Sequence, residues 1–219
     1  MKPLKTPIGK KISEIYAALY LHFSRKKEKR QRPVDDPESL RHFLNTRASH
    51  VAQTSLFGYL RTRTGMRYFE LFSDDVFADS LNIAKWQLWL ACLSDLSAYA
   101  GGLISQRTSI EQSVLRELMI NTLAAILAET GIPADAGPAF REAAEQVRKR
   151  INSLDWTRVA DDESIFSESP PALVRWAPII DELKQRDEAI VINSVRFRWQ
   201  EVRREFRTVL AADTLIGKL

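Results

Sequence analysis

Apolar residues recur at intervals of three and four along most of the chain, which is the spacing of one face of an α-helix. The pattern is clearest over residues 188–210, where six apolar residues follow this spacing and arginines occupy the other sides. Sustained alternation of apolar and polar residues is missing, as are the Asn-Gly and Asp-Gly pairs typical of hairpin turns. The pattern therefore predicts an all-α protein.

The first predicted helix covers residues 7–29 and carries a single apolar stripe that includes Tyr16 and Tyr20. It runs into a strongly basic stretch, so we expect it to fray before a linker at residues 31–35. Residues 1–35 are thus interpreted as a basic amphipathic helix and linker. The residues expected to bind an anionic surface there are Lys10, Lys11, Arg25, Lys26, Lys27, Lys29, Arg30 and Arg32.

The second and third predicted helices have recognisable start signals. Asp36 can cap the second helix, Pro37 is favoured at the first helical position, and Gly65 is a typical C-terminal stop. Asp74 and its neighbours start a long helix at residues 76–99, which is apolar around most of its circumference. We expect this helix at the centre of the fold.

Further helices follow a pair of glycines at 101–102. Thr108 and Ser109 precede Glu111 and Gln112 at the spacing of a capping box, which predicts a helix that ends at residues 131–133. A shorter helix follows from Pro138, and the chain then loosens into a polar, acidic connection at 152–171. Pro178 is expected to break the next apolar segment at Ala177, before the last helix at 188–210.

Together these elements predict an irregular multi-helix bundle of six to eight helices, with the bundle domain at residues 36–219 and the first helix either docked on it or detached. The length of 219 residues suits one large domain or a domain with a tail. Its 45% hydrophobic and 27% charged residues are ordinary for a globular protein, so neither disulfides nor a metal is needed for stability.

The net charge of +4 is unevenly distributed. Residues 1–68 contain 15 Lys and Arg against 5 Asp and Glu, a net charge of +10, whereas the remaining residues contain 17 against 23, a net charge of −6. An anionic partner is therefore expected at the N-terminal third.

Cysteine usage and hydropathy indicate a cytoplasmic protein of bacterial type. The single cysteine, Cys92, lies in an apolar run, which predicts a core position in a reducing compartment. The basic N-terminal residues are not followed by the continuous apolar stretch of a secretory signal, and the most apolar region, 76–104, is interrupted by polar residues. We expect the basic end to dock, if on a membrane, at its inner face.

Common enzyme motifs are missing from the sequence. It contains no G-x-S-x-G, no P-loop, no G-x-G-x-x-G and no His-Glu-x-x-His, and one cysteine cannot form Cys-x-x-Cys. The three histidines, His22, His42 and His50, are interpreted as ordinary helix residues, because a helical rise of ~1.5 Å per residue puts His42 and His50 about 12 Å apart, too far to share a metal. The sequence thus favours a non-catalytic role and no cofactor.

Asp75 and Asp79 are the main indication of an enzyme. Their D-x-x-x-D spacing puts two carboxylates one turn apart on a helix, an arrangement that can hold Mg²⁺ against a diphosphate. It resembles the aspartate motif of all-helical isoprenoid synthases over five residues, and that resemblance implies a magnesium-dependent activity on a phosphate or diphosphate. The alternative is that Asp74 and Asp75 stabilise a helix N-terminus.

A second set of candidate residues follows the second helix, where arginines and hydroxyl side chains interleave up to the Thr-Arg-Thr-Gly run at 62–65. Such donors would suit a phosphate or carboxylate ligand, whereas a solvated face with ion pairs explains them equally well. The candidate ligand-binding residues are Arg47, Arg61, Arg63 and Arg67.

The sequence therefore favours a binding or adaptor protein, in which residues 8–32 dock on an anionic membrane surface or a partner protein. Two alternatives stay open. One is a magnesium-dependent enzyme at Asp75 and Asp79, and the other is a nucleic-acid-binding protein, which the sequence pI near 9.2 would suit.

Overall fold

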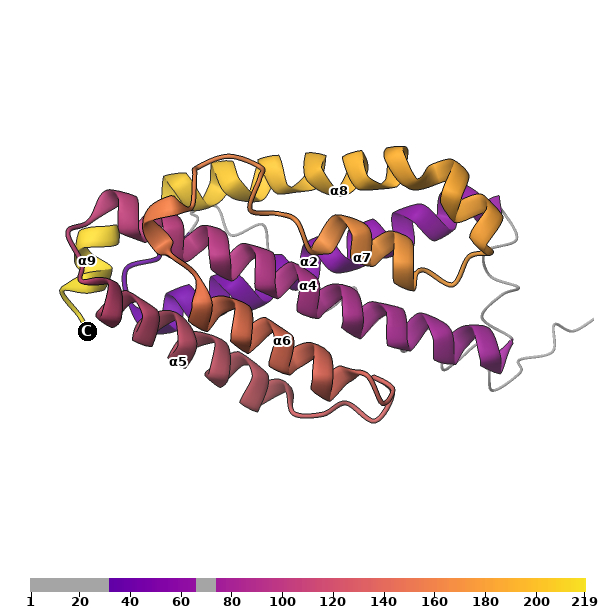
Figure 1. Ribbon diagram of the computed structural model, residues 1–219, viewed down its shortest axis with the longest axis horizontal. Coiled ribbons are helices and arrows are strands. Elements are labelled where there is room, and N and C mark those ends of the chain that lie inside the picture. The colour runs from indigo at the N-terminus through magenta and orange to yellow at the C-terminus, as the bar shows by residue number, and fades with distance from the viewer. Residues whose placement is uncertain (1–31, 66–73) are drawn as a thin grey trace, which may run out of the picture.

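Seven α-helices and a short 3₁₀ helix make up the residues that the structure, a computed structural model, describes: 32–65 and 74–219 (Figure 1). The predicted all-α, multi-helix bundle is confirmed, while the predicted helix at 7–29 lies outside the described residues. The helices are α2 (Pro37–Thr64), α4 (Asp75–Arg107), α5 (Gln112–Thr130), α6 (Phe140–Ser153), η2 (Trp156–Arg158), α7 (Ser169–Trp176), α8 (Asp181–Val209) and α9 (Ala212–Ile216).

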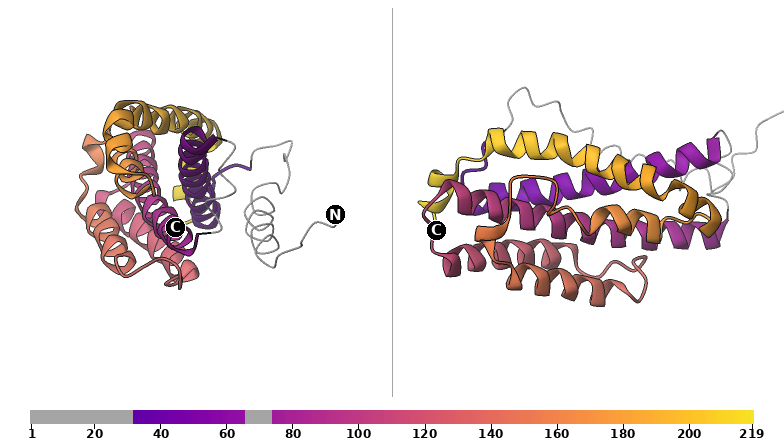
Figure 2. Two further views of the ribbon diagram at one scale, coloured as in Figure 1. Left: turned by 90° about the vertical axis from the view of Figure 1, so that its right-hand side faces the viewer. Right: turned by 45° about the horizontal axis from the view of Figure 1, so that its top comes forward.

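The long helix α4 is the element around which the others pack, as the sequence predicts. It contacts α2, α5, α6, η2, α7 and α9, while α8 packs on α2 and α7. In Figures 1 and 2, α5 and α6 lie on one side of α4 and α8 lies on the other. Within the described residues only α4 is long and apolar enough to cross a membrane, but 89% of its apolar window is buried inside the fold, as in a core helix.

Local capping explains where α2 begins and ends, and both predicted signals are confirmed. The backbone N–H of Ser39 donates to the Asp36 carboxylate at 2.7 Å, and the Asp36 N–H donates to the Ser39 hydroxyl at 3.1 Å. Pro37 occupies the first turn, and Gly65 follows the last turn with a φ of 54°, a backbone conformation that favours glycine.

The glycines at 101–102 do not end the central helix, contrary to the sequence prediction that it stops near Tyr99. α4 continues to Arg107 because both glycines are packing sites. A Cβ on Gly101 would overlap the Trp156 ring, and one on Gly102 would overlap Val159. The glycines therefore let η2 lie directly against the α4 backbone.

The predicted capping box at Thr108 is wrong, because α5 begins only at Gln112. Thr108 is the C-terminal cap of α4, and its hydroxyl donates to the Ile104 carbonyl at 2.9 Å. Glu111 precedes α5 and makes no side-chain cap. The predicted end of this helix at Gly131 is confirmed.

The C-terminal half contains more ordered structure than the sequence predicts. The connection from α6 to α7 is irregular, as expected, but it buries Trp156, Val159 and Phe166 in the core. α7 ends before Ala177 as predicted, whereas α8 begins at Asp181, seven residues earlier than expected. The short helix α9 has no counterpart in the prediction.

We expect Gly101→Ala to lower the free energy of unfolding by about 1–3 kcal/mol, because the added methyl group must displace the Trp156 ring. Urea denaturation followed by circular dichroism measures the change. The matched control is Gly217→Ala, where the added Cβ would lie 3.4 Å from its nearest neighbour and little loss is expected. Equal stability of the two variants would contradict the packing described for η2.

Candidate functional site

The sequence-predicted site residues fall into several separate places. Of the eight predicted anion-binding residues, only Arg32 is described, and it is exposed. Of the four arginines predicted to bind a ligand, Arg67 lies outside the described residues. Arg61 is exposed on α2 and forms no hydrogen bond or ion pair within the described part of the chain.

The other two predicted arginines are held by carboxylates of α8. Arg47 donates from Nε and Nη2 to the two carboxylate oxygens of Glu205, at 2.7 and 2.5 Å. Arg63 donates to Asp187, which also accepts from the Tyr59 hydroxyl at 2.9 Å. Because the Asp187 side chain is only 5% exposed, its pairing with Arg63 fixes α2 against α8.

Asp75 and Asp79 are both exposed in the first turns of α4. Asp74, immediately before them, accepts from the backbone N–H groups of Val76 and Phe77 at 2.9 and 3.2 Å, so it acts as the N-cap. No group of three or more His, Cys, Asp or Glu side chains is placed to hold a metal among the described residues. The magnesium site thus stays a prediction based on two carboxylates.

The most extensive polar cluster centres on Asp95, in the middle of α4, whose side chain is 0% exposed. Its carboxylate accepts from Arg150 on α6 at 2.7 Å and from the Ser169 hydroxyl on α7 at 2.7 Å. The backbone N–H groups of Glu168 and Ser169 also donate to it. Trp199 on α8 donates to the Ser169 hydroxyl at 2.9 Å, so the cluster joins four helices.

The electrostatics of this cluster indicate a structural role. Burial raises the pKa of Asp95, and Arg150 and Ser169 act in the opposite direction. Burial, together with Asp95, raises the pKa of the Cys92 thiol well above its usual range, so this buried thiol stays neutral and unreactive.

Sequence reasoning missed the cluster, although one signal pointed to it. Asp95 is an acidic residue inside an apolar helix, and a buried carboxylate requires a partner.

A second cluster fastens the connection between α6 and α7. The Tyr99 hydroxyl donates to the Asp161 carboxylate at 2.6 Å, and Arg203 donates to the Asp161 backbone carbonyl at 2.7 Å. Arg207 reaches the same carboxylate at 3.3 Å. Burial and the neighbouring Asp161 raise the pKa of Tyr99 to about 12. The acidic connection is therefore tied to both α4 and α8.

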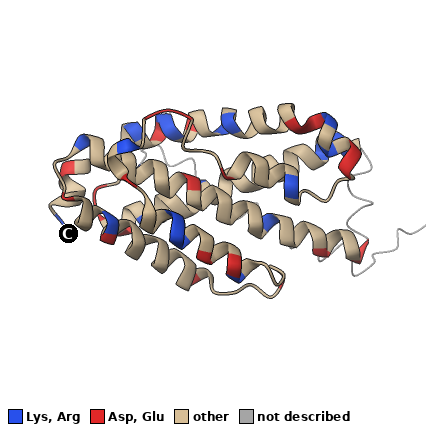
Figure 3. Ribbon diagram, in the orientation of Figure 1, with Lys and Arg blue, Asp and Glu red and all other residues tan. Residues whose placement is uncertain are grey.

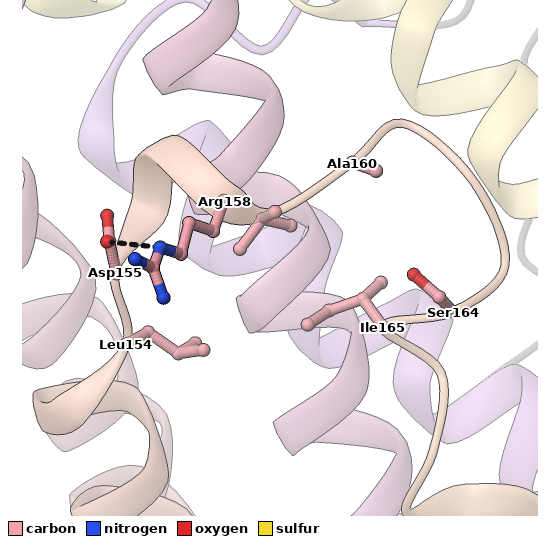
Figure 4. A pocket seen from close by; sticks show the side chains of 7 residues that line it. Leu154, Asp155, Arg158, Ala160, Ser164 and Ile165 are labelled. Atoms are coloured by element: carbon pink, nitrogen blue, oxygen red, sulfur yellow. Dashed lines mark ion pairs between the residues drawn. The ribbon is translucent and has the colours of Figure 1, made fainter.

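The same connection borders an open pocket of about 280 Å³ (Figure 4). Its charged side chains are Arg158 and Asp155, which pair with each other at 3.2 Å. Leu154 and Ile165 supply part of its apolar lining. The pocket thus offers a small apolar surface beside one ion pair.

We expect Asp95→Asn to lower the free energy of unfolding by about 3–5 kcal/mol, because it leaves the Arg150 guanidinium largely buried without its counter-ion. Chemical denaturation measures the loss. The matched control is Glu145→Gln, which breaks an exposed pair with Arg148 and should cost less than about 1 kcal/mol. A loss at Asp95 no larger than at Glu145 would show that the cluster does not hold the helices.

The raised pKa of Tyr99 predicts a pH dependence of stability. The unfolded chain loses the tyrosine proton near pH 10, whereas the folded protein keeps it up to about pH 12. Stability from this group is therefore present below pH 10 and lost as the pH rises to about 12. We expect Tyr99→Phe to flatten the fall in unfolding free energy over this window, measured by urea denaturation at a series of pH values. If the unfolding free energy of Tyr99→Phe falls with pH as steeply as that of the unmodified protein, the raised pKa of Tyr99 is wrong.

Comparison with known proteins supplies no relative for this chain. No protein-family model, no curated protein and no solved structure matches it. A function has to be argued from the charges, the burial and the contacts of its own residues.

Proposed function

We propose that the protein is a non-catalytic binding protein that docks on an anionic membrane surface through its basic N-terminal residues 8–32. The observation that carries this proposal is the distribution of charge. Residues 1–31 contain nine Lys and Arg against two Asp and Glu, a net charge of +7. Residues 32–219 contain 23 against 26, a net charge of −3. The positive charge available to a partner is thus concentrated at one end of the sequence.

The ion pairs of the helical body support the proposal. Arginines of the body are engaged in the fold: Arg47 with Glu205, and Arg150 with Asp95. In Figure 3 the Lys and Arg residues of the described helices are interspersed with Asp and Glu. Because residues 32–219 carry a net charge of −3 and their cations lie among carboxylates, the body offers an anionic surface much less attraction than the N-terminal residues do.

The basic residues are joined to the body at a fixed point. The Val34 N–H donates to the Val209 carbonyl at 2.8 Å, and the Ala211 N–H donates to the Val34 carbonyl at 3.0 Å. Val34 is 2% exposed. The chain therefore enters the bundle beside the C-terminal end of α8, and a docked N-terminal segment would hold that end of the bundle towards the membrane.

The binding free energy expected for the basic N-terminal residues fits reversible docking on a membrane. Residues 25–32 contain six Lys and Arg, and each such residue near an anionic surface contributes about 1 kcal/mol. An apolar stripe on the preceding residues would add insertion energy, and binding by two such signals is stable yet sensitive to salt. We place the protein at the inner face of a bacterial-type cytoplasmic membrane, where anionic lipids and reducing conditions coincide.

Co-sedimentation with vesicles of phosphatidylglycerol or phosphatidylcholine tests the proposal. We expect the full-length protein to sediment with the anionic vesicles only, and binding to weaken as the salt concentration rises. Replacing the six Lys and Arg of residues 25–32 by glutamine should abolish binding, and so should removing residues 1–33. Circular dichroism checks that each variant keeps its helices.

The matched control is a variant with Arg141, Arg148 and Lys149 replaced by glutamine, because these cations are exposed on α6. It should sediment like the unmodified protein. Loss of binding in this control alone would move the contact to the body. If no variant sediments, membrane docking is wrong, and binding of a DNA duplex by the full-length protein would then support the nucleic-acid alternative.

A further inference from the structure

The helices α2 and α8 run antiparallel and contact each other along a row of side chains, which we call the seam. Its two ends are fastened by the pairs described above, Arg47 with Glu205 and Arg63 with Asp187. Arg198 projects from α8 between these two pairs and reaches α2 at Gly58. The seam therefore contains three arginines. The outer two, Arg47 and Arg63, each pair with a carboxylate of α8.

Arg198 is partly buried, and its guanidinium lies against the α2 backbone. A Cβ at Gly58 would stand only 3.2 Å from the Arg198 Nη2, so the missing side chain provides the space that the guanidinium uses. The Arg198 Nε is buried and donates to no acceptor among the described residues. The position of this side chain is thus fixed by packing and not by a counter-ion.

Arg198 differs from the other two arginines of this seam in that it pairs with no carboxylate of the described residues. Within the described part of the chain no Asp or Glu oxygen lies within ion-pair distance of it, whereas Arg47 and Arg63 each have one. Burial lowers the pKa of the Arg198 guanidinium, which shows that this charge is held in an unfavourable environment. A partly buried cation without a counter-ion is costly, and an anion from solution would offset that cost.

Arg61 adds a second cation beside the same glycine. It follows Gly58 by three residues, so it lies about one turn further along the same edge of α2. It is exposed and unpaired among the described residues. Glu201 lies one turn from Arg198 on α8 and is also exposed, but it forms no ion pair with Arg198. Arg198 therefore contacts Gly58 from α8, and Arg61 follows Gly58 by one turn on α2; neither arginine is paired among the described residues.

We propose that this seam is a binding site for a phosphate group, in which Arg198 and Arg61 donate to the phosphate oxygens over Gly58. The planar fork of a guanidinium matches two oxygens of a phosphate, and the double negative charge of a phosphate monoester suits two arginines. The source of the group is either a free phosphate ester or a lipid headgroup. The site does not depend on membrane docking by residues 8–32.

Titration calorimetry of the full-length protein with inorganic phosphate, at neutral pH and constant ionic strength, tests the site. We expect saturable binding that Arg198→Gln weakens at least tenfold and Arg61→Gln weakens about threefold. Arg148→Gln, on an exposed arginine of α6, should leave the affinity unchanged. Failure of the unmodified protein to bind phosphate, or equal affinity in the Arg198→Gln variant, would overturn the proposal.

Folding of the variants gives an independent readout. Because Arg198 pairs with no carboxylate of residues 32–65 or 74–219, its replacement by glutamine should not lower the urea midpoint, whereas Arg47→Gln breaks a pair and should lower it. Glu201→Gln should leave phosphate binding intact or strengthen it. A lower midpoint for Arg198→Gln together with unchanged phosphate binding would mean that Arg198 serves only to pack the seam.

Vesicles containing phosphatidic acid distinguish the two sources. If the site takes a lipid headgroup, Arg198→Gln weakens sedimentation with these vesicles, and so does Phe197→Ser, since Phe197 is 72% exposed beside Arg198. If the ligand is a free phosphate ester, both variants behave like the unmodified protein in sedimentation, while only Arg198→Gln loses phosphate. Failure of membrane docking by residues 8–32 leaves the calorimetric result unaffected, so the two proposals fail separately.

Discussion

The packing at the centre of the bundle depends on the buried carboxylate of Asp95. Its oxygens are out of contact with water, so their hydrogen-bond donors have to come from other elements: a guanidinium of α6 and the first N–H groups of α7. The residue that precedes α7, Glu168, makes no cap of its own, and Asp95 supplies that cap from 73 positions earlier in the sequence. One acidic side chain thus sets where α6 and α7 can lie on α4.

Much of the fold follows from local sequence signals, and the exceptions have long-range causes. The ends of α2 could be predicted because a cap involves residues that are neighbours in the chain. Gly101 was misread as a stop because its reason, the ring of Trp156, lies 55 residues away. Thr108 was misread as a start because the sequence does not show that its hydroxyl turns back to Ile104.

The candidate sites could be predicted only in part, for the same reason. Charge counting locates the basic N-terminal residues, and no contact needs to be known for that. The arginines of α2 look alike in sequence, yet Arg47 is neutralised by a residue 158 positions away and Arg61 is not. Whether a cation is a ligand-binding group or a structural one is decided by such distant partners. The special position of Arg198 has no sequence signal at all.

The pairing of Val34 with the backbone at residues 209–211 has a consequence for how the molecule forms. These contacts join segments about 175 residues apart, so the closure of this end needs one of the longest loops among the described residues and comes late in folding. During synthesis the basic residues 1–31 leave the ribosome well before residues 209–211, which fix their point of attachment. The basic segment is therefore exposed to its surroundings while the bundle is still incomplete.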